Sequence, residues 1–247
     1  MNKIGWCNLT WNPVWGCNNN CEYCYARGIA KRFWANIYIK EVNYQIELHP
    51  DWAWTGDHLT GLEDFKPTFL ITHFKKKFPK KPQRIFVGSM SEIYYWEKEW
   101  MERVLDKIRQ YPQHTFQFLT KFAHVYNKYT FPNNCWLGIT ITENYDFERQ
   151  ECYLDDFRYK WHTFISFEPL LEEIYIGDIE YLNVDWVIIG AETGNRKDKV
   201  IPKKEWVWDI VNYCKTNNIP VYLKDSIIKL FPGLEAYKQF PKNKGGD

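Results

Sequence analysis

The sequence predicts an α/β fold of parallel βα units, arranged as a partial or full (β/α) barrel. Three observations favour this class. Short runs rich in β-branched and aromatic residues recur along the chain, amphipathic helical patterns lie between several of them, and the spacing is roughly 25–30 residues. No internal repeat and no long linker interrupts the chain, so we expect residues 1–247 to form a single domain.

The expected strands share one pattern, which is a short β-rich run closed by polar residues. Their ranges are 84–88, 115–119, 136–141, 163–167, 185–190 and 220–223. Functional groups of parallel α/β folds lie at the carboxyl ends of the strands. The polar residues found there are Ser89, Ser91, Glu92, Lys121, Thr142, Glu143, Glu168, Glu192, Lys224 and Asp225. Each could instead be polar only because a strand end meets water.

Helices are expected between the strands. Residues 97–111 and 203–217 place apolar side chains on one helical face and charges on the other, and residues 144–160 do so less clearly. Residues 38–83 interrupt the alternation of strands and helices. We interpret this segment as an elaborated first crossover or an inserted lid.

Composition excludes several classes of protein. Aromatic residues make up 19% of the chain, which is incompatible with a disordered polymer. The 32 basic and 31 acidic residues give a net charge of +1, so no global field draws the chain onto nucleic acid or an anionic membrane. There is no signal peptide pattern and no apolar run of membrane-spanning length. We therefore expect a cytoplasmic protein that has no membrane partner and acts as a monomer.

Three of the seven cysteines fall within eight residues, as Cys17-x3-Cys21-x2-Cys24. Three converging thiolates suit a [4Fe–4S] cluster in which one iron has no protein ligand. Two alternatives stay open. One is a zinc site completed by Cys7 or a distant His, since structural zinc takes four ligands. The other is a chance group of buried cysteines.

The other cysteines show no grouping that could hold a second cluster. They are Cys7, Cys135, Cys152 and Cys214. Cys214 lies on the apolar face of the helix expected over 203–217, which is typical of a core thiol. We interpret all four as ordinary thiols.

The cysteine motif, with Tyr23 before its last cysteine and Tyr25 after it, resembles the hallmark of the radical S-adenosylmethionine (SAM) superfamily. Further segments are similar to successive blocks of the phage Gp37/Gp68-like family, which is related to that superfamily. They are residues 10–17, 24–26, 84–91, 113–121, 136–138, 167–171 and 185–194. Many members have a longer gap between the first two cysteines, whereas this chain has the standard radical SAM spacing.

The resemblance implies a radical SAM enzyme with a TIM-barrel-like fold and two cofactors, a [4Fe–4S] cluster and SAM. Cys17, Cys21 and Cys24 would be the cluster ligands. An electron from a flavodoxin- or ferredoxin-type reductant would cleave SAM, and the resulting 5′-deoxyadenosyl radical would abstract a hydrogen atom from the substrate. The family's occurrence in phages suggests a nucleotide or DNA base as the substrate, in nucleotide modification.

The resemblance also implies roles for residues at the strand ends. Glu168, Lys121 and Glu192 would be catalytic. The residues that would bind the cofactor are Tyr23, Tyr25, Ser89, Ser91, Thr120, Thr142 and Ser166. Ser89 and Ser91 stand where many superfamily members have a Gly-Gly-Glu segment. The alternative for each strand-end residue is a cap on the following helix.

Three other functions stay open at this point. The first is a DNA-lesion repair lyase resembling spore photoproduct lyase. The second is a non-catalytic zinc or iron–sulfur protein that acts with a partner. The third is a nucleic-acid-binding protein without redox chemistry, which the near-zero net charge disfavours. The basic run Lys75–Lys81 could contact phosphates or could be a solvated loop.

Overall fold

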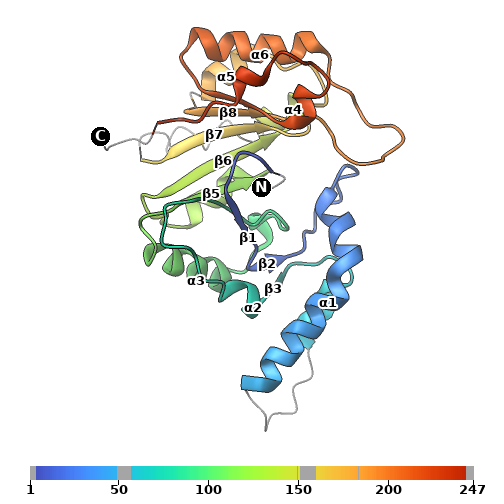
Figure 1. Ribbon diagram of the computed structural model, residues 1–247, viewed down its shortest axis with the longest axis vertical. Coiled ribbons are helices and arrows are strands. Elements are labelled where there is room, and N and C mark those ends of the chain that lie inside the picture. The colour runs from blue at the N-terminus through green and yellow to red at the C-terminus, as the bar shows by residue number, and fades with distance from the viewer. Residues whose placement is uncertain (1–3, 49–56, 149, 151–159, 183, 243–247) are drawn as a thin grey trace.

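A seven-stranded parallel sheet forms the centre of the protein, as a computed structural model shows (Figure 1). The model describes residues 4–48, 57–148, 150, 160–182 and 184–242. In spatial order the strands are β1 (Leu9–Trp11), β4 (Arg84–Val87), β5 (Thr115–Thr120), β6 (Cys135–Ile141), β7 (His162–Phe167), β8 (Trp186–Ile189) and β9 (Val221–Leu223). Every neighbouring pair is parallel, and the sheet curves into a half-barrel with β1 and β9 at its edges. The predicted class, a partial (β/α) barrel, is therefore confirmed.

The six predicted strands are all present, and two of the predicted helices are confirmed as α3 (Lys98–Arg109) and α6 (Lys204–Thr216). The range 144–160 contains the short helix α4 (Tyr145–Glu148), but residues 149 and 151–159 lie outside the described part. The edge strand β1 was not predicted. The remaining short elements are α5 (Ile176–Leu182), α7 (Asp225–Ile228) and the 3-10 helices η2 (Ile93–Tyr95), η3 (Ala123–Lys128) and η4 (Glu235–Tyr237).

The first crossover is elaborated as predicted, but the predicted start at residue 38 is wrong. Residues 38–48 are the second half of one long helix, α1 (Tyr25–Leu48), which is the crossover helix itself. The added elements follow it: the 3-10 helix η1 (Asp57–Leu62), β3 (Thr68–Phe69) and α2 (Ile71–Phe74). β3 pairs antiparallel with β2 (Val14–Trp15), just before the cysteine motif. Residues 49–56 lie outside the described part.

Alternation along the strands gives the sheet two apolar faces. The outer face is covered by α3 on one half and by α5 and α6 on the other, with β-branched and aromatic side chains between. The inner face holds a cluster of large rings, which we call the aromatic floor. Its buried members are Trp6, Cys7, Phe86, Trp136, Phe164, Trp186, Ile188 and Tyr222. The floor fills the half-barrel, and this use of rings accounts for part of the high aromatic content.

Gly138 on β6 makes room for this floor. A Cβ atom built on Gly138 would lie 2.3 Å from the ring of Phe164, which pairs with it across the sheet and is fully buried. We expect Gly138→Ala to destabilise the fold by about 1–3 kcal/mol, the usual cost of overpacking a core. Urea unfolding followed by circular dichroism measures this.

Gly177→Ala is the matched control for this change, because a Cβ atom on Gly177 in α5 meets nothing within 4 Å. Alanine is the better helix former, so the control is expected to retain or gain stability. Equal unfolding midpoints for the two variants would contradict the role assigned to Gly138.

No helix in the described part of the chain is both long enough and apolar enough to cross a lipid bilayer.

Candidate functional site

A cavity of about 1170 Å³ lies at the carboxyl end of the sheet. The three motif cysteines line it, together with residues that follow β4, β5, β7, β8 and β9. Trp6, Phe86 and Tyr222 of the aromatic floor line it as well. The predicted location of the site, at the strand ends, is therefore where the structure has its cavity.

The cysteine loop, residues 17–24, runs from β2 to the start of α1 and is held by its own backbone. The Cys17 sulfur accepts a hydrogen bond from the Asn19 N–H at 3.3 Å, and the Cys24 sulfur accepts one from the Arg27 N–H at 3.4 Å. Such bonds stabilise thiolates and tune iron–sulfur clusters. Burial raises the pKa of the Cys17 thiol to about 12, a shift that a bound cation would oppose.

Arg27 holds the same loop from within α1. Its guanidinium donates to the carbonyl oxygens of Cys17 and Asn19, at 3.4 and 2.9 Å, and lies over the Phe65 ring at 5.2 Å. The Tyr95 hydroxyl donates to Asn19 Oδ1 at 2.7 Å. Two different segments therefore fix the loop conformation.

Gly16 joins β2 to the cysteine loop in a conformation that favours glycine. Its φ is +103°, and a Cβ atom there would lie 2.0 Å from the Lys66 carbonyl oxygen. Its N–H donates to the Met90 carbonyl oxygen at 3.0 Å, and the next N–H, of Cys17, donates to Phe65 at 2.8 Å. The first cysteine is thus positioned by a close backbone approach.

The three motif cysteines are the donors that a metal group at this site would use. No three Cys, His, Asp or Glu side chains among the described residues are grouped so that they could ligate one metal ion. Cys7, the fourth ligand that a zinc site could use, packs in the aromatic floor. Thiolates that bind different irons of a cluster lie farther apart than thiolates around one ion. The three motif cysteines line the same cavity, and two of their sulfurs accept N–H bonds.

Ten of the thirteen predicted site residues line the cavity. They are Cys17, Cys21, Tyr23, Cys24, Tyr25, Ser89, Ser91, Lys121, Glu168 and Glu192. The Tyr25 hydroxyl donates to the Ser89 carbonyl oxygen at 2.8 Å, and Ser89 Oγ donates to Asn12 Oδ1 at 3.0 Å. The Trp96 indole N–H donates to Ser91 Oγ at 3.0 Å. These contacts fix the loop after β4 against the start of α1, the turn between β1 and β2, and the end of η2.

The other three predicted residues do not line the cavity. Thr120 donates to the buried carboxylate of Glu92. Thr142 donates its N–H and hydroxyl to Asp146 Oδ2, at 2.7 and 2.8 Å, which places it at the start of α4. Ser166 Oγ lies 3.5 Å from Glu168 Oε2. Polar strand-end side chains can thus turn toward a neighbouring carboxylate instead of the cavity.

Glu92 joins the ends of β4 and β5. Besides Thr120, it accepts from the N–H of Tyr94 at 3.2 Å and from the N–H of Lys121 at 3.0 Å. Burial raises the pKa of the Glu92 carboxyl. Because the folded state then binds the proton more tightly than the unfolded chain, this group costs stability as pH rises above 4.5, its ordinary value.

A pH series on Glu92→Gln tests this. We expect the free energy of unfolding of the variant minus that of the unchanged protein to increase between about pH 5 and about pH 8, because only the unchanged protein loses stability as the carboxyl ionises. Urea unfolding at the two pH values measures it. Glu97→Gln, an exposed change just before α3, is the control. A difference that falls with pH would contradict the assignment.

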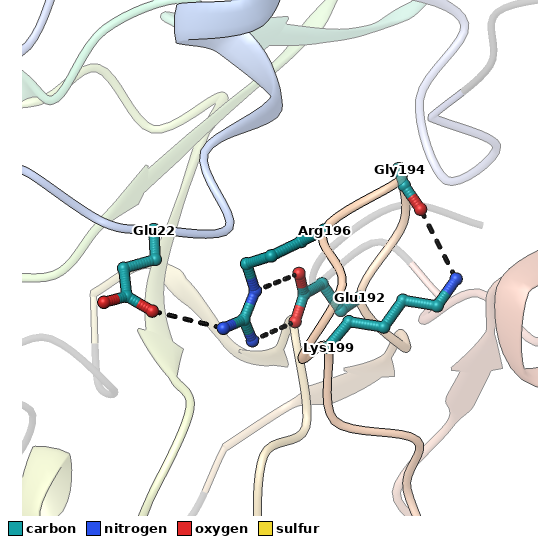
Figure 2. A network of polar contacts seen from close by, with 5 residues as sticks. All are labelled: Glu22, Glu192, Gly194, Arg196 and Lys199. Carbon is teal, nitrogen blue, oxygen red and sulfur yellow. Dashed lines mark hydrogen bonds and ion pairs between the residues drawn. The ribbon is translucent and has the colours of Figure 1, made fainter.

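Two basic residues outside the predicted catalytic and cofactor-binding sets pair with predicted carboxylates. Lys224, at the end of β9, forms an ion pair with Glu168 in the cavity. Gly190 lies between them, and a Cβ atom there would be 3.0 Å from Lys224 Cδ. Arg196, after β8, donates through Nε and Nη2 to the two carboxylate oxygens of Glu192, each at 2.8 Å (Figure 2). This hydrogen-bonded ion pair lowers the pKa of Glu192.

Cys135, Cys214 and the basic run Lys75–Lys81 do not line the cavity. Cys135 and Cys214 are buried in the two outer cores, and Cys152 lies outside the described residues. In the basic run, Lys75 contacts Tyr44, and the Lys76 ammonium donates to the Thr10 carbonyl oxygen at 3.0 Å. Part of the run is therefore used in intramolecular contacts.

Fold and site together define an α/β half-barrel protein with a three-cysteine loop on the wall of a strand-end cavity. The chain belongs to DUF5131, a family described as protein of unknown function, which matches residues 1–227. Comparison with curated proteins and with solved structures gave no match.

Proposed function

We propose that this protein is a radical SAM enzyme. One observation carries the proposal: Cys17, Cys21 and Cys24 line one large cavity at the carboxyl end of a parallel half-barrel, together with polar residues that follow β4, β5, β7, β8 and β9. Cys17, Cys21 and Cys24 would hold a [4Fe–4S] cluster, which would supply the chemistry for reductive cleavage of SAM with a flavodoxin- or ferredoxin-type donor.

The residues of the chain hold the cluster, orient SAM and the substrate, and limit the access of water to them. The three thiolates hold the cluster, and the N–H groups of Asn19 and Arg27 stabilise charge on two of the sulfurs. Arg27 and Gly16 keep the loop in one conformation, so the ligands are positioned before the cluster binds.

The cavity also has a suitable size and lining. Small-molecule sites usually enclose about 300–1,000 Å³, so a cavity of about 1170 Å³ can take SAM and a substrate together. Trp6, Phe86 and Tyr222, which belong to the aromatic floor, give the cavity an apolar surface that limits the access of water to bound SAM and substrate.

The polar wall offers groups that can orient ligands. Ser89 and Ser91 line the same cavity as the three cysteines, and SAM would bind beside them. Lys121 and the Glu168–Lys224 pair lie at other strand ends and would contact the substrate. The resemblance to a phage family supports a nucleotide or DNA base as that substrate, either for modification or for lesion repair.

The test is anaerobic reconstitution with iron and sulfide, followed by metal analysis and addition of SAM and dithionite. We expect about four irons per chain and no zinc, and 5′-deoxyadenosine formed in a SAM-dependent manner. Stoichiometric zinc, with no iron–sulfur absorbance and no SAM cleavage, would overturn the proposal in favour of a non-catalytic binding protein.

A further inference from the structure

We propose that Arg196 is a positioning residue that latches the loop between β8 and α6 onto the cysteine loop. The inference rests on the proposed function, since it gives the latch a task at the same site. We call the three residues Glu22, Arg196 and Glu192 the Arg196 bridge. They join segments 174 positions apart in the chain.

The bridge uses all three arms of one guanidinium. Nε and Nη2 bind the two oxygens of Glu192, and Nη1 donates to Glu22 Oε2 at 3.1 Å (Figure 2). A bidentate pair fixes the plane of the guanidinium as well as its position. Arg196 therefore presents its third arm to Glu22 in a set direction.

The two carboxylates have different surroundings. The Glu192 side chain is 1% exposed, whereas that of Glu22 is 81% exposed. The Glu192–Arg196 half is thus part of the fold, and the Arg196–Glu22 half is a separable surface contact. Exposed ion pairs are weak, so this half can open and close without unfolding the protein.

Both ends of the bridge lie in segments that line the cavity. Glu22 lies between Cys21 and Cys24, and the loop after β8 contributes Ala191, Glu192, Thr193, Gly194, Lys199 and Ile201 to the cavity lining. The Lys199 ammonium donates to the Gly194 carbonyl oxygen at 3.4 Å, so the loop is folded back on itself. In Figure 1 this loop, in orange, extends from the sheet toward the cysteine-loop end of α1. The latch therefore brings the two sides of the cavity wall together beside the second and third cysteines.

Alkylation of the metal-free protein tests the latch. In Glu22→Ala, which leaves the Glu192–Arg196 pair intact, iodoacetamide should modify Cys21 and Cys24 about two- to fivefold faster, the factor expected for loss of an exposed ion pair. Peptide mass spectrometry measures the rate at each cysteine. Buried Cys214 should be unaffected and reports any general loosening of the fold.

Three further variants sharpen the result. Arg196→Gln should give at least the same increase, and Glu22→Asp should restore much of the slow rate. Lys197→Gln, an exposed change on the same loop, is the control and should change nothing. Unchanged rates at Cys21 and Cys24 in Glu22→Ala would overturn the proposal, as would an equal increase at Cys214.

A second measurement connects the latch to the cluster. In reconstituted Glu22→Ala, we expect the electron paramagnetic resonance signal of the reduced cluster to lose part of its SAM-dependent change, and KM for SAM to rise more than kcat falls. The alkylation result needs no cluster. If the latch proposal is wrong, alkylation is unchanged in Glu22→Ala while the unchanged protein still cleaves SAM. If the proposed function is wrong, the unchanged protein itself does not cleave SAM.

Discussion

Cys21→Ala is expected to abolish cluster binding, so that the reconstituted variant is colourless and forms no 5′-deoxyadenosine from SAM. Cys21 is the middle ligand of the motif, and two thiolates from one loop cannot hold a cluster that needs three protein ligands. Iron and sulfide analysis after gel filtration, with the visible absorbance spectrum, measures the loss.

Cys214→Ala is the control for this result, because Cys214 is a fully buried core thiol on α6 and leaves all three motif cysteines in place. It should bind iron like the unchanged protein. If Cys21→Ala retained the full iron content and spectrum, the three-cysteine assignment would be wrong, and Cys7 would become the residue to test next.

Gly16→Ala is expected to lose the cluster although every ligand is still present. An alanine at φ +103° is strained, and its Cβ atom would lie 2.0 Å from the Lys66 carbonyl oxygen, so the backbone on one side has to move. We expect a loss of about 2 kcal/mol or more in the free energy of unfolding, from left-handed strain and overpacking together. Urea unfolding and iron content after reconstitution are the two measurements.

Gly28→Ala is the matched control, since Gly28 lies in α1 just after the motif and a Cβ atom there meets nothing within 4 Å. It should bind iron normally and should be as stable or more stable, because alanine favours helix. Normal iron binding by Gly16→Ala would show that the cysteine loop tolerates a shift of the backbone that precedes it.

Much of the fold could be predicted because the central strands are apolar on both faces and each is closed by polar residues. β1 was missed because Leu9–Trp11 is only three residues long. α1 was missed because its apolar residues are not confined to one face: Ile29, Phe33 and Ile39 are exposed, whereas the polar residues Glu41 and Gln45 are buried. Glu41 is buried because it accepts hydrogen bonds from Thr72, a contact that no local pattern reveals.

The location of the candidate site could be predicted because functional groups of parallel α/β folds lie at the carboxyl ends of the strands. This principle places a residue near the cavity, but the hydrogen-bond partner of its side chain determines where the side chain points. Thr120 and Thr142 turn to Glu92 and Asp146 for this reason. Arg196 gave no signal, because it lies in a loop seven residues beyond the last residue of β8 and meets Glu22 only in the folded chain.

The aromatic floor has a consequence for the order of events. Trp6, Phe86 and Tyr222 close the end of the cavity that faces the inside of the half-barrel. If SAM lies against the cysteines and the substrate lies on the strand-end side of it, we expect bound substrate to slow the release of SAM.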